Sequence, residues 1–149
     1  RFAYLLCRTS NPGAGALQDL VVAADPAHHA PAERIHERVA RLATTWGPGG
    51  TVGLVVGATA PQELATIRAI APGLAFLVPG VGAQGGAIEP VLADGPATAP
   101  PAGGRPGGGL LVNVSRGIAG AALGEGPGDP FERVAAAGAA WAGRLPVLP

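Results

Sequence analysis

Residues 74–86 read LAFLVPGVGAQGG, a short apolar run (Leu74–Val78) that is followed directly by a glycine-rich loop (Pro79–Gly86). The run is almost continuously apolar rather than alternating, which is typical of a strand buried on both faces of a parallel sheet. Three further runs have the same character and also end in small, polar or glycine residues: Phe2–Cys7, Val52–Val56 and Leu110–Val114. The sequence therefore predicts four buried strands, each followed by a loop of small, polar or glycine residues.

Helical patterns fill the intervals between these runs. Pro31 suits the first turn of a helix, and the residues that follow it at helical spacing are Ile35, Val39, Leu42 and Trp46. Thr59 and Gln62 indicate a capping box before a second apolar stripe, which is formed by Leu64, Ile67 and Ile70. A short helix is expected over Ala87–Leu92.

The last helix is expected to begin at Asp129, because Pro130 and Glu132 complete a typical start signal. Its apolar face would carry Phe131, Val134, Ala137, Trp141 and Leu145. Residues 94–109, DGPATAPPAGGRPGGG, have no periodicity and many residues that break helices and strands. This segment is predicted to be a flexible Pro/Gly-rich loop.

Four strands that alternate with helices predict an α/β fold with a parallel sheet and covering helices. Both an open doubly wound sheet and a (β/α)8 barrel have this alternation. A full barrel takes ~250 residues, so four units in 149 residues would form about half of one. We therefore expect residues 1–149 to be a single partial domain.

Composition restricts the function classes. Ten basic residues balance ten acidic ones, so no basic excess favours nucleic acid or an anionic membrane surface. All ten basic residues are arginines, and the sequence contains no lysine. No apolar run approaches the ~18–20 residues of a membrane span, and the first residues do not resemble a signal peptide. The expectation is an intracellular, cytoplasmic protein whose sequence begins partway through a fold.

The single cysteine and the three histidines are candidates for catalytic or metal-binding residues, and their sequence context favours neither role. Cys7 lies in an apolar strand, where a buried, unreactive thiol is usual. His28, His29 and His36 have no Cys, Asp or Glu at a recognised metal-ligand spacing. We predict surface histidines and no metal site.

The glycine-rich loop supports an anion site better than a dinucleotide site. Gly80, Gly82 and Gly85 satisfy G-x-G-x-x-G, but they follow the third strand and no acidic residue stands about 20 positions on. Clustered glycines would still let backbone amides converge on a phosphate. Gln84 adds an amide donor, and Arg116, after the next strand, adds a guanidinium. The alternative is that the glycines only turn the chain and that Arg116 is a surface charge.

With these segments in place, the chain resembles orotidine 5′-phosphate decarboxylase. LLCRTSNPGA, VGLVVGATAPQEL, FLVPGVGAQGG and LLVNVSRGI are similar to the family's fifth to eighth strands, from Phe2 to about Ala121. The resemblance implies the carboxyl-terminal half of a (β/α)8 barrel, no cofactor, and a homodimer as the full-length enzyme. It implies conversion of orotidine 5′-phosphate to UMP and carbon dioxide.

The resemblance also implies roles for individual residues. Gln84 and Arg116 would hold the 5′-phosphate, helped by backbone amides around Ser115–Gly117. Pro79 would line the pocket near the base. Ser10 would contact the pyrimidine ring, or would be a plain turn residue before Asn11 and Pro12.

One departure from the family is larger than any match. The family's reactive centre is an Asp-x-Lys-x-x-x-Asp motif with a further lysine, and no lysine is present here. Arginine cannot replace it, because a guanidinium does not release its proton near neutral pH. Three hypotheses stay open: the substrate-binding half of the decarboxylase, another phosphosugar-binding barrel enzyme, or a non-catalytic nucleotide- or phosphate-binding module.

Overall fold

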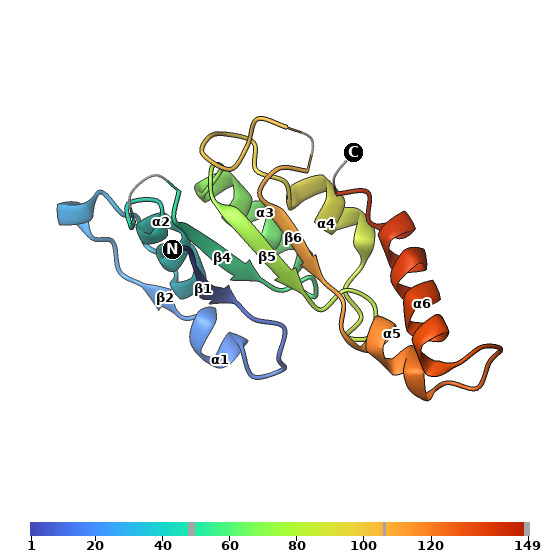
Figure 1. Ribbon diagram of the computed structural model, residues 1–149. Coiled ribbons are helices and arrows are strands. Elements are labelled where there is room, and N and C mark those ends of the chain that lie inside the picture. Colours follow the sequence, from blue (N-terminus) through green and yellow to red (C-terminus); the bar gives the residue numbers. More distant parts are fainter. Residues whose placement is uncertain (48–49, 106, 148–149) are drawn as a thin grey trace.

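The computed structural model describes residues 1–47, 50–105 and 107–147, apart from the side chain of His28, and is built on a parallel sheet (Figure 1). Its strands lie in the order β1-β4-β5-β6, and each neighbouring pair is parallel. Their bounds are β1 Ala3–Arg8, β4 Val52–Val56, β5 Ala75–Pro79 and β6 Leu110–Asn113. The four predicted strands are confirmed to within one residue at each end.

The first β–α unit is more elaborate than the sequence pattern predicted. Between β1 and the next long helix lie α1 (Gly15–Gln18), the 3-10 turn η1 (Pro26–His28) and a hairpin of β2 (Val21–Val22) with β3 (Glu33–Arg34). The remaining elements are α2 Ile35–Ala43, α3 Pro61–Ile70, α4 Ile88–Asp94, α5 Arg116–Ala119, η2 Gly120–Leu123 and α6 Pro130–Arg144. Among the described residues, no helix is long and apolar enough to cross a membrane.

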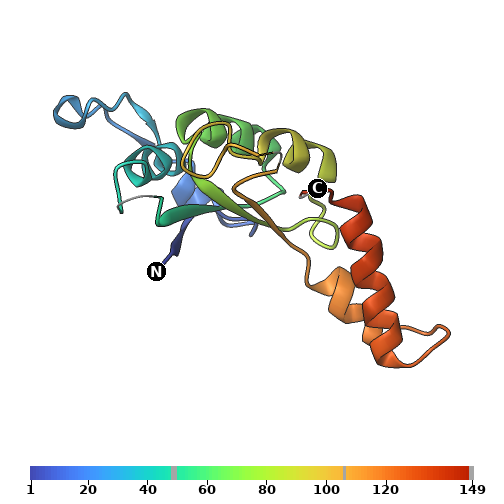
Figure 2. The same cartoon turned by 45° about the horizontal axis from the view of Figure 1, so that its top comes forward.

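One face of the sheet forms the core. Alternate side chains of β4 and β5, such as Leu54 and Phe76, are fully buried, and they pack with Leu64 and Ile67 of α3 and Val91 of α4. Figure 2 shows α3 and α4 together on this side of the sheet. Burial of this apolar surface accounts for the position of both helices.

The opposite face of the sheet is not covered in the same way. Leu6, Val55, Leu77 and Leu111 form one row across it, because they are paired in register from β1 to β6. At the two ends of the row, Leu6 is 69% exposed and Leu111 is 53% exposed. Both end strands also have a free edge within the described sheet.

The predicted apolar stripe of α2 is confirmed only in part. The helix begins at Ile35, because Glu33 and Arg34 belong to the hairpin. Val39 packs against the core as expected, but the most deeply buried residues are His36, Ala40 and Ala43. Since the helix ends at Ala43, Trp46 lies outside it and is 45% exposed. The hairpin is held in turn by Glu33, a buried carboxylate that accepts hydrogen bonds from Arg38 and Arg41.

The helix starts agree with the prediction in one case and differ in another. Asp129 and Glu132 form the reciprocal capping box of α6, with Asp129 accepting from the Glu132 amide at 2.9 Å. At α3 the capping box of Thr59 and Gln62 does not form, since Ala60 occupies the cap position and makes no side-chain hydrogen bond. The apolar face predicted for α6 also fails at Phe131, which is 88% exposed.

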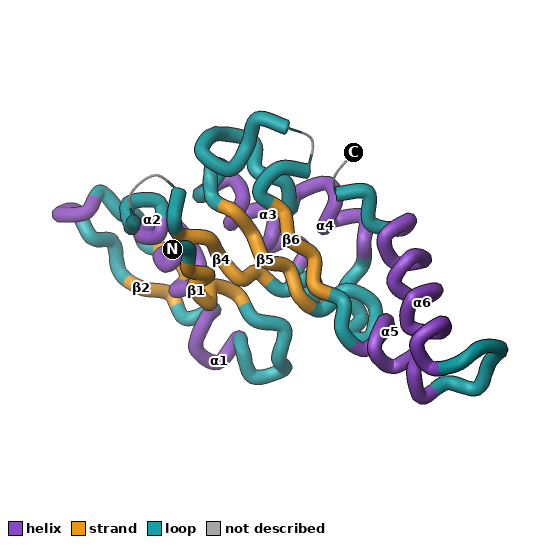
Figure 3. Tube along the Cα trace, viewed as in Figure 1, coloured by secondary structure: helices purple, strands orange, loops and turns teal. Residues whose placement is uncertain are grey.

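The Pro/Gly-rich loop lies against the amino end of β5. Its backbone amides donate to neighbouring carbonyls, from Thr98 to Pro72 at 2.9 Å and from Ala102 to Gly73 at 3.1 Å. The described residues between α4 and β6 form neither helix nor strand. The predicted flexibility of residues 94–109 stays a prediction. Figure 3 shows the loop as one long connection to β6.

A single buried arginine ties this end of the fold together. The Arg68 guanidinium donates to the carbonyls of Ala71, Leu74 and Gly95 at 2.9, 2.8 and 2.6 Å. It also lies 3.4 Å from the ring centroid of Phe76. Burial lowers the pKa of Arg68 to about 10, which leaves it charged at neutral pH. One side chain thus joins the ends of α3 and α4 to the start of β5.

We expect the Arg68→Met variant to lose about 3 kcal/mol or more of unfolding free energy, because each buried carbonyl left without a donor costs about 1–3 kcal/mol. Urea unfolding followed by circular dichroism measures the loss. Arg133→Met is the matched control, since Arg133 also donates to backbone carbonyls but is only partly buried. Equal losses in the two variants would contradict the role given to burial.

The uncovered sheet face predicts that the chain self-associates, because free strand edges and exposed apolar rows favour pairing. Size-exclusion chromatography with light scattering should give a mass above that of one chain, and Leu111→Asp should shift it towards the monomer. Leu123→Asp is the control, because Leu123 is 91% exposed on η2, away from the sheet. A monomeric wild-type chain would refute this prediction.

Candidate functional site

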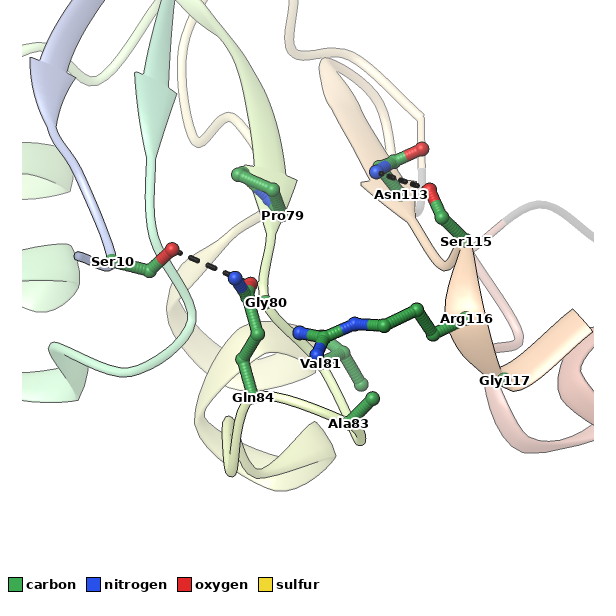
Figure 4. Close-up of a pocket in the computed structure, with 10 residues that line it drawn as sticks. All are labelled: Ser10, Pro79, Gly80, Val81, Ala83, Gln84, Asn113, Ser115, Arg116 and Gly117. Carbon is green, nitrogen blue, oxygen red and sulfur yellow. Dashed lines mark hydrogen bonds between the residues drawn. The ribbon is translucent and has the colours of Figure 1, made fainter. Parts of the chain in front are cut away.

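A pocket of about 270 Å³ lies at the carboxyl ends of three strands (Figure 4). Ser10 reaches it from the segment after β1, and the other lining residues come from the ends of β5 and β6 and the loops that follow. Parallel pairing places these ends at one edge of the sheet. The lining residues are Ser10, Pro79, Gly80, Val81, Ala83, Gln84, Asn113, Ser115, Arg116 and Gly117.

All six residues that the sequence singled out line this one pocket. They are Ser10, Pro79, Gln84, Ser115, Arg116 and Gly117. Their roles in substrate binding stay predictions. Asn113 is a lining residue that the sequence analysis missed. It is the last residue of β6 and pairs with Pro79, and its Nδ2 donates to Ser115 Oγ at 3.3 Å. A polar residue at a strand end was the available signal.

Ser10 and Gln84 face each other although they are far apart in the sequence. Ser10 Oγ donates to Gln84 Oε1 at 3.4 Å. The approach depends on Gly57, because a Cβ at that position would lie 3.0 Å from Ser10 Cβ and 3.1 Å from its backbone nitrogen. The Gly57 amide also donates to the Arg8 carbonyl at 2.7 Å. The end of β4 therefore fixes the backbone that carries Ser10.

The glycine-rich loop is closed by its own hydrogen bonds. Gly80, Gly82 and Gly85 have positive φ angles of 98°, 76° and 88°, which favour glycine. The amides of Gly82, Gly85 and Gly86 donate to the carbonyls of Gly86, Gly82 and Gly80. The sequence predicted backbone amides that converge on an anion. The observed loop differs, since these three amides donate to carbonyls of the loop itself. The glycines instead shape a loop that presents the Gln84 side chain.

Arg116 is the only charged side chain among the described residues that line the pocket. It is exposed, and none of the hydrogen bonds or ion pairs of the described residues involves its guanidinium. Figure 4 shows it extended across the pocket towards the loop of Gln84. A guanidinium can bind two oxygens of one phosphate or carboxylate. The arrangement therefore suits a small anion held between Arg116 and Gln84.

Two of the three histidines have side chains that the structure describes, His29 and His36. His36 is buried, with 1% exposure, so its predicted surface position is wrong. Its Nδ1 lies 2.9 Å from the Gln18 carbonyl, an acceptor that makes this burial possible, and 3.3 Å from Asp19 Oδ1. His29 is exposed as expected, and the side chain of His28 lies outside the described part. Among the described residues, no group of three or more metal-ligating side chains comes together.

Cys7 is a buried thiol, as its place in the sequence predicted. It is 2% exposed, and its Sγ donates to the His36 carbonyl at 3.1 Å. Burial raises the pKa of the Cys7 thiol to about 12. Since the thiolate is the nucleophile, Cys7 is not suited to covalent chemistry.

Residues 1–126 match the family model described as "Orotidine 5'-phosphate decarboxylase / HUMPS family". The orotidine 5′-phosphate decarboxylase of Halorubrum lacusprofundi is 53% identical over 119 residues, which are 77% of this chain and 38% of that protein. The orotidine 5′-phosphate decarboxylase of Azoarcus sp. is 46% identical over 91% of this chain and 43% of its own length. The chain thus spans about two fifths of these curated relatives.

A solved structure is similar to this chain in both sequence and fold. The OMP decarboxylase of Leishmania donovani superposes with a TM-score of 0.66 and 38% identity, covering 91% of this chain and 44% of that one. The four parallel strands and their helices therefore correspond to part of that structure.

We expect Cys7 to resist an aromatic disulfide reagent at pH 8. With a pKa of about 12, the thiolate is roughly one part in ten thousand at that pH, and the site is closed to the reagent. Reaction in the folded chain should be at least about 100-fold slower than in urea, as followed by absorbance. Equal rates in the two conditions would contradict the burial of this thiol.

Proposed function

Because the chain belongs to the orotidine 5′-phosphate decarboxylase / HUMPS family, we propose that it is the substrate-binding part of an enzyme that converts orotidine 5′-phosphate to UMP and carbon dioxide. In this proposal the four β–α units are the carboxyl-terminal half of a (β/α)8 barrel. The order of the matched segments, which the resemblance places at the fifth to eighth strands, supports this placement. The uncovered sheet face would then point into the barrel.

One observation carries the proposal. Three strand ends bring Ser10, Gln84 and Arg116 to one pocket, and Arg116 is the one charged side chain among the described residues that line it. Phosphate sites of barrels are frequently built from the loops after strands seven and eight, the positions proposed here for β5 and β6. The pocket thus offers a cation and an amide to the phosphate, and the Ser10 hydroxyl lies next to that amide.

The proposed roles follow from position. Arg116 and the Gln84 amide hold the 5′-phosphate, helped by the backbone of Ser115 and Gly117. Ser10 contacts the pyrimidine ring, and its hydrogen bond to Gln84 connects the residue that contacts the base to the one that contacts the phosphate. Pro79 lines the pocket near the base. Binding of the phosphate would then orient the ring at a distance from it.

The chain supplies no lysine for the acid–base step that the resemblance implies. We propose that the aspartates and lysines of the reactive centre lie on strands that this sequence does not contain. The chain on its own would bind nucleotide and would not decarboxylate it. The complete enzyme would be a cytoplasmic homodimer without a cofactor.

A second candidate function is a non-catalytic module that binds UMP or a related phosphate ester. The absence of lysine favours it if the chain acts alone. Decarboxylation by a chimera, in which this chain replaces the matched region of the Halorubrum lacusprofundi enzyme, supports the first function. Nucleotide binding without turnover in that chimera supports the second.

We expect Arg116→Ala to lower kcat/KM of that chimera by about 10- to 100-fold for orotidine 5′-phosphate, since a hydrogen bond to a charged group contributes about 1.5–3 kcal/mol. With orotidine, which lacks the phosphate, the same substitution should have little effect. Steady-state kinetics on both substrates measures the difference.

The matched control is Arg105→Ala, because Arg105 is an exposed arginine in the loop before β6, at the opposite end of the strands. It should leave kcat/KM unchanged for both substrates. If Arg116→Ala lowers kcat/KM equally for orotidine and its 5′-phosphate, Arg116 does not bind the phosphate.

A further inference from the structure

Trp141 of α6 contacts both loops that form the pocket. Its Nε1 donates to the Gly117 carbonyl at 3.3 Å. On the side of the glycine-rich loop, a Cβ built on Gly82 would lie 2.7 Å from Cη2 of the indole. A Cβ built on Gly117 would likewise lie 2.7 Å from Nε1. The two loops therefore lie against different parts of one indole. At both contacts the distance is too short for a residue with a Cβ.

We propose that Trp141 is a positioning residue that sets the separation between the Gln84 loop and the Arg116 segment, and thereby the affinity of the pocket for phosphate. The inference rests on the proposed function in taking the ligand as a phosphate ester. It adds a residue outside the pocket lining to the binding apparatus.

The pocket needs such a support because its two sides are not joined directly. Among the described residues, no hydrogen bond connects residues 80–86 to residues 115–117. The segment with Arg116 lies in a helix of four residues, α5, that has no buried residue. Its backbone position is therefore weakly determined by its own element. The contact with Trp141 gives this segment a buried partner, which α5 does not have within its own four residues.

Trp141 itself is firmly placed. It is partly buried and packs against the main core, and the Arg144 guanidinium lies 4.2 Å from its ring centroid. At the other end of α6, Arg133 donates to the carbonyls of Ala121 and Ala122 in η2. A 15-residue helix with a capping box thus carries the indole to the two loops that flank the pocket.

The first test uses the indole as its own reporter. The sequence has two tryptophans, and Trp46 lies outside the helices and is 45% exposed, so Trp46→Phe in the full chain leaves Trp141 as the only one. Calorimetry gives the affinity for UMP, and fluorescence is followed in the same titration. The emission of Trp141 should change with the calorimetric Kd. Binding without any change in emission would overturn the proposal.

The second test separates positioning from folding. Trp141→Phe keeps an aromatic ring on α6 but loses the hydrogen bond to Gly117 and the outer ring atoms that lie beside Gly82. It should weaken UMP binding about 3-fold with little change in Tm. Trp141→Leu should weaken it about 10-fold or more. If both variants bind UMP as the parent does, Trp141 has no positioning role. If the parent itself does not bind UMP, the proposed function fails together with this inference.

The third test uses the close contact at Gly117. Gly117→Ala should reduce UMP affinity at least about 10-fold, because the new Cβ displaces the segment from the indole. In the Trp141→Leu background, where the indole is gone, the same substitution should reduce affinity only about 2-fold. An equal reduction in both backgrounds would show that Gly117 acts independently of Trp141 and would overturn the proposal.

Discussion

Parallel pairing of four strands in the order β1-β4-β5-β6 determines where the pocket and the uncovered sheet face lie. Because every strand runs the same way, every carboxyl end lies at one edge, and the segments after β1, β5 and β6 meet there. The pocket is the consequence. The same pairing leaves one row of apolar side chains, from Leu6 to Leu111, without a cover, so binding site and uncovered face have one origin.

Close packing at this edge requires residues without side chains. Gly57 admits the backbone of Ser10, and a Cβ on Gly86 would lie 2.6 Å from both Ala58 Cβ and the Gly80 carbonyl. Trp141 occupies the space that side chains at Gly82 and Gly117 would need. These glycines therefore act mainly by leaving room for neighbouring backbone and side chains to pack closely against them. Gln84 and Arg116 are the side chains that we propose to bind the anion.

The sequence predicted those features that depend on residues close together in the chain. The strands were predictable because they are continuous apolar runs, and the pocket residues because they follow strand ends. The face of α2 that is buried most deeply was not predictable, since it depends on Glu33. This residue lies in the hairpin and accepts hydrogen bonds from Arg38 and Arg41 of the helix. The burial of His36 likewise depends on a carbonyl 18 residues away. Such long-range partners leave no periodic signal in the sequence.

We propose that two consecutive strand-end segments form one phosphate site in this chain of the orotidine 5′-phosphate decarboxylase / HUMPS family. A crystal structure of the chain grown with UMP tests it most directly. We expect the 5′-phosphate between the Arg116 guanidinium and the Gln84 amide, with the uracil ring on the side of Ser10. A nucleotide bound with its phosphate away from both residues, or bound only outside this pocket, would contradict it.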